Sequence, residues 1–347
     1  MLRCGRRRKA IRAEAWASAG LLLFLCGLSR AGAARMEADW PNLFTRDKVT
    51  IAVTDSGLGG LSVMAEAAAR LRAARSFRSV DLVFWNSLFS NDSGYNSLET
   101  RRQRILVFDS SLRRLAAEVK PDLILVACNT LSVLLDDVPF VRETNIPIAG
   151  IIEAGAAQMA EALKAEPRAV GLLFGTKTTI AEGVHLQKLI ASGIDASRLT
   201  PQPCPNLVGR IEEDWRGKET ERLISSFVAE AAERLADPTA PVYAALFCTH
   251  FGYAAELWER AFASRGLRLA GLVNPNSRWI DFLDPPERKN RFRRSRLRTR
   301  VISMVEIPAG VRTSLGEWLE KISPETAAAL RKYRLAPGLF EWASLLK

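Results

Sequence analysis

The sequence predicts an α/β protein made of two similar units, each with a mostly parallel β-sheet. Short aliphatic and β-branched runs alternate with longer amphipathic stretches, a pattern typical of parallel sheets covered by helices. The 347 residues suit two domains of ordinary size, and 48% of them are hydrophobic. Two of the apolar runs also end in the same way, with a cysteine followed by two polar residues.

The runs expected to form strands fall into two series. The first series lies at 48–55, 80–85, 122–128 and 146–152, and the second includes 169–175 and 241–248. The stretches between them carry apolar residues at the i, i+3, i+4 spacing of amphipathic helices. These helices are expected at 59–74, 98–120, 179–192 and 219–236, with a loop at 200–209. Near the C-terminus, Ser323 and Glu325 predict a capped helix within 323–334.

The two series of predicted strands resemble each other in sequence pattern. "LILVACNTLSVLL" and "YAALFCTHFGYAAEL" share a buried strand, a cysteine, two polar residues and the start of a helix. The distance from Cys128 to Cys248 is what a duplicated half of that size would give. We therefore expect pseudo-symmetric domains with the active site in the cleft between them. The first would hold 48–150 plus 271–347, and the second 151–270.

The net charge of +11 is concentrated in two short runs. Arg3, Arg6, Arg7, Arg8, Lys9 and Arg12 form the first, and Arg288, Lys289, Arg291, Arg293, Arg294, Arg296, Arg298 and Arg300 form the second. Removing these 14 charges from +11 leaves −3, so the rest of the chain is near neutral. This argues against nucleic acid as a partner. The run at 288–300 predicts a linker or an exposed strand in preference to an arm that binds acidic surfaces.

The N-terminal 35 residues have two interpretations. The first basic run is followed by "ASAGLLLFLCGL" and by Ala31 and Ala33 in A-x-A order, as in a signal peptide over residues 1–33 that directs export to the periplasm. Alternatively, Met36 is the translation start, residues 1–35 are an upstream extension and the protein is cytoplasmic. The apolar stretch is too short to span a bilayer, and no later segment predicts a membrane contact.

The cysteines and histidines exclude several kinds of site. Cys4 and Cys26 lie in the leader, so Cys128, Cys204 and Cys248 remain, and they form neither a disulfide framework nor a C-x-x-C pair. His185 and His250 are the only histidines in the sequence. We therefore expect neither zinc nor any other metal.

Cys128 and Cys248 both lie where ligands bind in parallel α/β sheets, at the carboxyl end of a strand. A nearby helix N-terminus is expected to favour the thiolate. A single cysteine there more often just completes a buried strand. Two in matching contexts, facing one cleft, are placed to remove a proton from one face of a carbon and return one to the other. This chemistry is that of a racemase or epimerase without cofactor.

Other polar residues lie at the same edge of the predicted sheets. Asp55 ends the first strand, and His250 lies two residues after Cys248, so each is placed to exchange a proton with a nearby thiol. "DSGLGG" permits close backbone approach to an anionic group, but lacks the G-x-G-x-x-G order of a dinucleotide site. In "FGTKTTI", we expect Thr176, Thr178 and Thr179 to cap a helix in preference to holding an anion.

With these residues assembled, the chain resembles glutamate racemase, of the aspartate/glutamate racemase superfamily, from about residue 48 to 275. The resemblance rests on "AVTDSGLGGLSV", "LVACNTLSV", "GLLFGTKTTI", "PCPNLVGRIEE" and "ALFCTHFGY", in family order. "CTHF" favours the glutamate branch, because aspartate racemases usually carry a glutamate after the second Cys-Thr. The resemblance implies an enzyme that makes D-glutamate for cell-wall peptidoglycan and needs no cofactor. Members of the family are often homodimers.

The resemblance also implies roles for individual residues. Cys128 would take the α-proton of the D-enantiomer and Cys248 that of the L-enantiomer. Asp55 would assist Cys128, and His250 with Glu212 would assist Cys248. The α-amino and carboxylate groups of the substrate would be held by Ser56, Asn129, Thr130 and Thr249, with Thr176 beside them.

One loop departs from the family pattern. The usual Asp-Thr-x-Arg-x-Pro-Tyr-Gly is replaced by "NSLFSNDSGYNS", residues 86–97, in which Asn86 takes the acidic position. Ser93, Gly94 and Tyr95 are the nearest substitutes for Pro-Tyr-Gly, and Glu153 stands where a proline is common. The alternatives are therefore a racemase or isomerase of another acidic or polar amino acid, or a non-catalytic small-acid binding protein.

Overall fold

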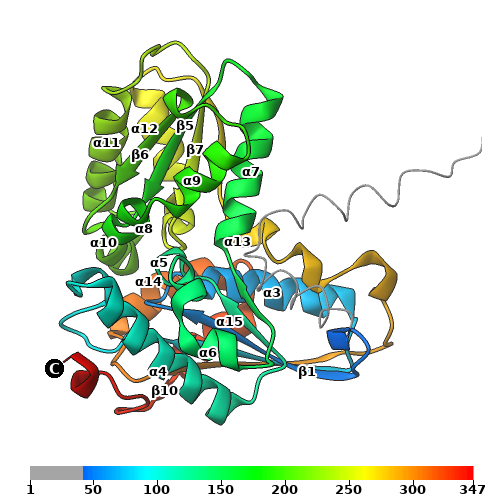
Figure 1. Ribbon diagram of the computed structural model, residues 1–347. Helices are drawn as coiled ribbons and strands as arrows, with labels where there is room; N and C mark the ends of the chain where they lie inside the picture. The colour runs from blue at the N-terminus through cyan, green and yellow to red at the C-terminus, as the bar shows by residue number, and fades with distance from the viewer. Residues whose placement is uncertain (1–41, 347) are drawn as a thin grey trace, which may run out of the picture.

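The computed structural model describes residues 42–346, which form two parallel sheets joined by helical connections (Figure 1). The predicted signal peptide or upstream extension lies outside the described residues. The first sheet has the strand order β10-β9-β2-β1-β3-β4. Its strands are β1 (Lys48–Asp55), β2 (Ser79–Asn86), β3 (Leu123–Val126), β4 (Ile148–Gly150), β9 (Arg296–Ser303) and β10 (Arg334–Leu335).

The second sheet repeats the central order of the first. It runs β6-β5-β7-β8, with β5 (Val170–Gly175), β6 (Leu199–Pro203), β7 (Val242–Phe247) and β8 (Leu269–Val273). In both sheets the first strand of the series lies between the second and the third, and the fourth lies outside the third. β3 and β7 are therefore equivalent strands, and Cys128 and Cys248 follow them. The predicted α/β class and the pseudo-repeat are confirmed.

Helices cover both sheets at about the predicted positions. The first unit contains α3 (Leu61–Ala74), α4 (Arg101–Val119), α5 (Asn129–Ser132), α6 (Pro139–Glu143), α14 (Ala309–Glu320) and α15 (Pro324–Arg331). The second contains α7 (Ile152–Ala165), α8 (Lys177–Glu182), α9 (Val184–Ala191), α10 (Leu207–Asp214), α11 (Lys218–Ala232) and α12 (Ala255–Ser264), and α13 (Pro275–Arg278) follows β8. The Ser323 side chain caps α15 by accepting from the Thr326 N–H, as expected.

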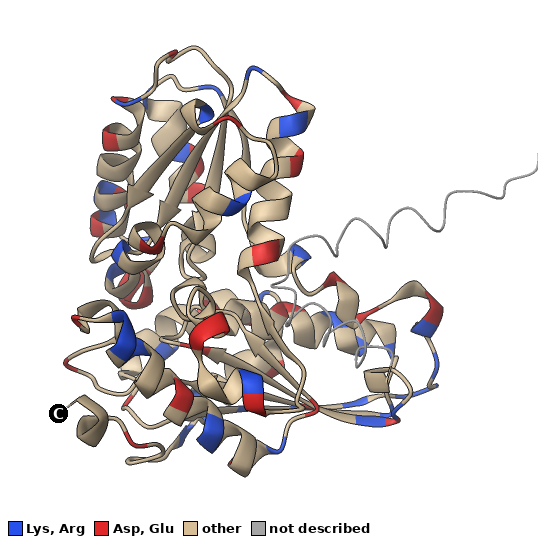
Figure 2. Cartoon of the chain, in the orientation of Figure 1, with Lys and Arg blue, Asp and Glu red and all other residues tan. Residues whose placement is uncertain are grey.

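The basic run at 288–300 proves to be partly a strand of the first sheet. β9 pairs in parallel with β2 along its whole length, from Ser79 opposite Arg296 to Asn86 opposite Ser303. Arg296 and Arg298 point to solvent, and Arg300 pairs with Asp81 at 2.5 Å. The prediction of an exposed strand therefore holds for residues 296–300. Figure 2 shows basic and acidic residues interspersed along the helices of both units.

The structure corrects two further expectations. The predicted loop at 200–209 contains β6, an edge strand that tolerates Pro201 and Pro203 because one side of it needs no ladder hydrogen bonds. The predicted helix at 179–192 is divided into α8 and α9 by Gly183, whose φ of +67° lies in the left-handed region.

The division into 48–150 plus 271–347 and 151–270 stays a prediction. In the structure, β8 carries the second sheet on to Val273, past the predicted boundary at residue 270. The units are also joined through Trp215, after α10, whose indole N–H donates to the Ser314 carbonyl of α14 at 3.1 Å. α14 thereby holds α10 against the first unit. Among residues 42–346, no helix combines the length and apolar character needed to cross a bilayer.

Gly183→Ala is expected to lower the free energy of unfolding by about 1 kcal/mol, because an alanine is strained in the left-handed conformation. Gly316→Ala is the matched control. Gly316 lies inside α14 with room for a methyl group, so alanine should raise stability by about 0.5–1 kcal/mol. Urea unfolding measures both values. Equal effects of the two substitutions would contradict this account of the break between α8 and α9.

Candidate active site

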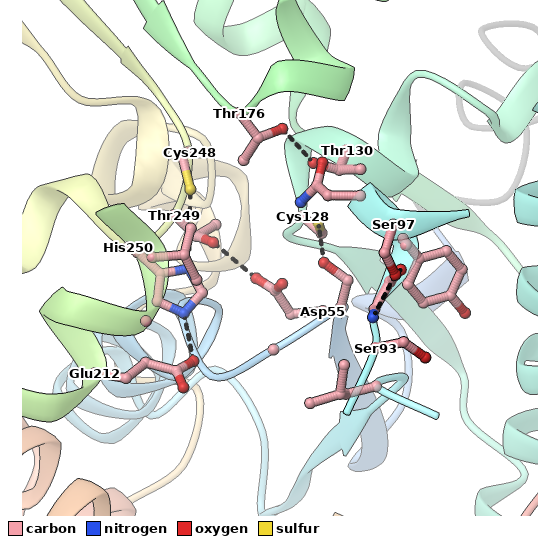
Figure 3. A pocket seen from close by; sticks show the side chains of 18 of the residues that line it. Asp55, Ser93, Ser97, Cys128, Thr130, Thr176, Glu212, Cys248, Thr249 and His250 are labelled. Atoms are coloured by element: carbon pink, nitrogen blue, oxygen red, sulfur yellow. Dashed lines mark hydrogen bonds and ion pairs between the residues drawn. The ribbon is translucent and has the colours of Figure 1, made fainter. Parts of the chain in front are cut away.

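A cavity of about 600 Å³ lies where the carboxyl ends of the two sheets face each other. Its lining comes from the turns after β1, β2, β3, β5 and β7 and from α10. Every site residue predicted from the sequence lines it: Asp55, Ser56, Ser93, Gly94, Tyr95, Cys128, Asn129, Thr130, Thr176, Glu212, Cys248, Thr249 and His250. In Figure 3, Cys248, His250 and Glu212 lie on one side, Cys128, Ser93 and Ser97 on the other, and Asp55 between them.

Cys128 is buried at the start of α5, and its Sγ lies 3.0 Å from Ser56 Oγ. Burial and the charge of Asp55 raise the pKa of the Cys128 thiol, while hydrogen bonds from Ser56 and Leu131 lower it in part. The expectation that a helix N-terminus would favour the thiolate is therefore wrong for this cysteine. α5 is a single turn of four residues, and desolvation outweighs its dipole.

Asp55 lies at the end of β1 with only 1% of its surface exposed. Its Oδ2 accepts a 2.8 Å hydrogen bond from Thr249 Oγ1. Burial raises the pKa of this carboxyl, against the opposing effects of His250, the Thr249 hydroxyl and the Cys128 thiol. Asp55 thus belongs to the first unit by sequence, but contacts both cysteine-containing turns.

Cys248, His250 and Glu212 form a chain of polar contacts across the cavity wall. Cys248 Sγ lies 3.8 Å from His250 Nδ1, and His250 Nε2 lies 2.7 Å from Glu212 Oε1. Burial acts to lower the pKa of His250, but its hydrogen bonds with Cys248 and Glu212 and their charges raise this pKa well above its ordinary value. These contacts favour the imidazolium form of His250 and place its Nδ1 against the Cys248 Sγ.

The glycine-rich turn "DSGLGG" allows close approach of the turn that follows β7. A Cβ atom added to Gly59 would lie 2.5 Å from His250 Nδ1 and closer still to Thr249 Oγ1. The absent side chain makes room for the turn that follows β7. The expected approach of this backbone to an anionic group is also present, because the Leu58 N–H donates to the Glu212 carboxylate at 3.1 Å.

Thr176 and Thr179 join the two units beside Cys128. Thr130 Oγ1 lies 2.9 Å from Thr176 Oγ1 and 3.1 Å from Thr179 Oγ1. Thr176 also caps α8 by accepting from the Thr179 N–H, which confirms the predicted cap. Thr178 is buried outside the cavity lining.

Residues 51–263, more than half of the chain, match the family described as Asp/Glu/Hydantoin racemase. The chain belongs to the Asp/Glu/hydantoin racemase family.

Curated relatives are consistent with this membership. The glutamate racemase of Aquifex pyrophilus is 30% identical over 183 residues, which cover 52% of this chain and 65% of that relative. The glutamate racemase of Chlorobaculum parvum is 29% identical over 206 residues, or 58% of this chain and 67% of that one. The match to the Aquifex protein thus spans slightly less than two thirds of its length.

Solved structures share the fold. The chain superposes on glutamate racemase from Campylobacter jejuni subsp. jejuni with a TM-score of 0.59 and 21% identity, over 78% of this chain and 98% of that one. It superposes on glutamate racemase from Francisella tularensis subsp. tularensis SCHU S4, solved with D-glutamate, with a TM-score of 0.61 and 18% identity, over 86% and 99% of the two chains. At these identities the likeness shows the fold alone.

The altered loop at 86–97 forms one wall of the racemase-family cavity. Asn86 is turned away, donating to the Ser303 hydroxyl at 3.1 Å and accepting from the Leu88 N–H at 3.0 Å. Tyr95 is buried edge-on against Phe89, with ring centroids 5.3 Å apart. The residues after Phe89 thereby face the cavity with mostly small polar side chains.

Sequence reasoning missed several lining residues. They lie in the altered loop, in the turn after β1, and in α10 or directly before it: Gly57, Leu88, Ser90, Asn91, Asp92, Asn96, Ser97, Asn206, Val208, Gly209, Arg210 and Glu213. The loop positions carry no hydrophobic period and the others lie in or directly before an ordinary amphipathic helix, α10, so only closeness to predicted residues could have indicated them. Glu153, at the other departure from the family pattern, pairs with Lys188 away from the cavity. Within the described part of the chain, no His, Cys, Asp and Glu cluster is suited to a metal.

Gly59→Ala is expected to destabilise the fold by about 1–3 kcal/mol and to reduce activity strongly, because its methyl group would displace Thr249 and His250. Gly209→Ala, also at the cavity but with open space around its Cα, is the control for stability. Thermal unfolding and turnover measure the two effects. Wild-type stability in Gly59→Ala would refute the close packing described here.

Glu212→Gln is expected to lower the pKa of His250, because the carboxylate that stabilises the imidazolium is lost. The pairing raises the folded-state pKa above 6.5, so its stabilisation is complete below pH 6.5 and is lost as the pH rises through the folded-state pKa. NMR titration of the histidine rings measures the shift. In unfolding experiments, the stability difference from wild type should shrink at alkaline pH; a difference that grows would contradict the assignment.

Proposed function

We propose that this protein is a cofactor-independent glutamate racemase that interconverts L-glutamate and D-glutamate with two thiols. The observation that carries the proposal is the pair Cys128 and Cys248, at equivalent strand ends of a repeated fold, both lining one cavity. Family membership and the names of the relatives support the reaction type.

In the L-to-D direction, Cys248 removes the α-proton as a thiolate next to the cationic His250. Cys128 then delivers its proton to the opposite face of the planar intermediate. The raised pKa of Cys128 supports this role, since the thiol form is the proton donor. In the D-to-L direction the roles are exchanged, and Asp55, in contact with both turns, helps to relay the proton of Cys128.

The remaining lining residues would hold the substrate. Ser56, Asn129, Thr130 and Thr249 surround the thiols and offer hydroxyl and amide groups to the α-amino and carboxylate groups, with Thr176 behind Thr130. Ser93, Gly94 and Tyr95 belong to the wall that would face the substrate side chain.

The altered loop favours a second candidate, a racemase of another acidic or polar amino acid. Its wall presents Ser90, Asn91, Asp92, Ser93 and Asn96 in place of the usual family motif. With glutamate as substrate, the product would supply cell-wall peptidoglycan. The homodimer that the resemblance implies stays a prediction.

Incubation with L-glutamate and a panel of other L-amino acids in deuterated water tests the function. Loss of the α-proton, followed by NMR, should accompany loss of optical rotation for the true substrate. The substrate that reacts fastest decides between glutamate and another amino acid. Binding without exchange of any α-proton would refute the racemase and leave a small-acid binding protein.

Cys128→Ser and Cys248→Ser are each expected to abolish racemisation, because each removes the group that serves one face. In deuterated water, Cys248→Ser should still exchange the α-proton of the D-enantiomer slowly, and Cys128→Ser that of the L-enantiomer, without inversion. Cys204→Ser, a buried cysteine outside the cavity lining, is the matched control and should racemise normally. Full turnover in either of the first two variants would contradict the mechanism.

A further inference from the structure

His185 is a buried titratable residue that the proposed mechanism does not use. It lies in the first turn of α9 and is 3% exposed. Its ring stacks on Phe247 with centroids 3.9 Å apart and planes 17° apart. Its Nε2 lies 3.0 Å from Oδ1 of Asn129, in the first unit.

These contacts join His185 to the neighbours of both thiols. Asn129 directly follows Cys128, and Phe247 directly precedes Cys248. Gly183 ends α8 in the left-handed conformation, and α9 begins with the next residue, which brings His185 to this position. One side chain of the second unit therefore contacts both cysteine-containing segments.

The protonation of His185 follows from the surrounding groups. Burial and the nearby Lys188 lower its pKa to about 3, so the ring is neutral at physiological pH. Its Nδ1 is buried without a hydrogen-bond partner among the described residues. With its proton on Nδ1, the ring would have an unsatisfied donor there, and its bare Nε2 would face another acceptor, Asn129 Oδ1. With its proton on Nε2, the ring donates a hydrogen bond to Asn129 Oδ1 over the 3.0 Å contact.

This tautomer determines which way the Asn129 amide faces. Because Oδ1 accepts from His185, the NH₂ group is directed elsewhere, and Asn129 lines the cavity. Within residues 42–346, the buried Nδ2 atom has no hydrogen-bond acceptor. An amide donor held in this way is suited to an anionic oxygen of a ligand in the cavity.

We propose that His185 is a positioning residue that holds the Asn129 amide so that its NH₂ group donates to the carboxylate of the amino-acid substrate. The assignment rests on the proposed function, because the ligand is the substrate of that reaction. His185 acts through Asn129 and does not itself exchange the α-proton. Its loss should therefore weaken substrate binding more than it slows the proton transfers.

Kinetics on the full chain test the role with matched substitutions. His185→Phe keeps an aromatic ring against Phe247 but removes the donor, and should raise KM about 10- to 100-fold with kcat changed less than about 3-fold. His185→Gln places an amide N–H near the position of Nε2 and should restore much of the binding. His185→Asn places it near the position of Nδ1 and should not.

A double-mutant cycle separates positioning from general packing. Asn129→Ala should raise KM by itself, and adding His185→Phe should then have little further effect, since the group that His185 orients is gone. Additive effects would overturn the proposal, as would equal KM values in His185→Gln and His185→Asn. Thermal unfolding of each variant identifies any loss of substrate binding that comes only from a less stable fold.

Nitrogen-15 NMR of the histidine rings tests the hydrogen bond without any turnover. The chain has two histidines, so the wild-type spectrum contains two ring systems, and that of His185→Gln assigns them. His185 should be neutral with the proton on Nε2, and its signal should shift in Asn129→Ala. A proton on Nδ1, or a cationic ring at pH 7, would overturn the inference even if the protein proves an active racemase. The expected tautomer in a protein that exchanges no α-proton would support the hydrogen bond and refute the proposed reaction instead.

Discussion

The 2.8 Å hydrogen bond from Thr249 to Asp55 joins the two units at the point where their central strands end. The other features of the site depend on this contact. It requires the turns after β1 and β7 to pack without an intervening side chain, which Gly59 permits. It also buries Asp55 completely, and burial is the largest cause of the raised pKa of this carboxyl. The closeness of the units thus creates the cavity and sets part of its proton chemistry.

The repeated fold places two thiols equivalently but surrounds them differently. Cys128 contacts the neutral Ser56 hydroxyl and lies near the buried Asp55, so its thiol form is favoured. Cys248 contacts the His250 imidazole, whose pKa is raised by its hydrogen bonds with Cys248 and Glu212. A reaction that removes a proton from one face of a carbon and adds another to the opposite face needs both a proton acceptor and a proton donor. The unequal surroundings of the two thiols suit the separate donor and acceptor roles of the proposed mechanism.

The sequence predicted those parts of the fold that depend on hydrophobic pattern. The strands that lead to Asp55, Cys128 and Cys248 are apolar runs, and they form β1, β3 and β7. β6 was missed because prolines such as Pro201 and Pro203 are rare in strands and are tolerated only at a sheet edge. β9 was predicted only as one of two alternatives, a linker or an exposed strand, because alternating arginines face solvent. These strands owe their position to pairing with neighbours distant in sequence, which local composition does not reveal.

The sequence predicted which residues form the candidate site better than it predicted their contacts and protonation states. Every predicted residue lines the cavity, because the ends of parallel strands gather at one edge. The prediction that Cys128 is a thiolate was wrong. Burial by the whole fold raises the pKa of its thiol, and the dipole of the four-residue helix α5 opposes this only weakly. The hydrogen bond between His185 and Asn129 joins the two units. The two residues lie 56 positions apart in the sequence, and no motif indicates their contact.

The central claim is that two different groups serve the two faces of the substrate carbon. The most direct measurement is the isotope pattern at low conversion, starting from protiated L-substrate in deuterated water and analysing both enantiomers by mass spectrometry. The account predicts that the first D-product carries deuterium at the α-carbon while the remaining L-substrate keeps its proton. D-product that retains the original proton would show that one group serves both faces, and would contradict the two-thiol mechanism.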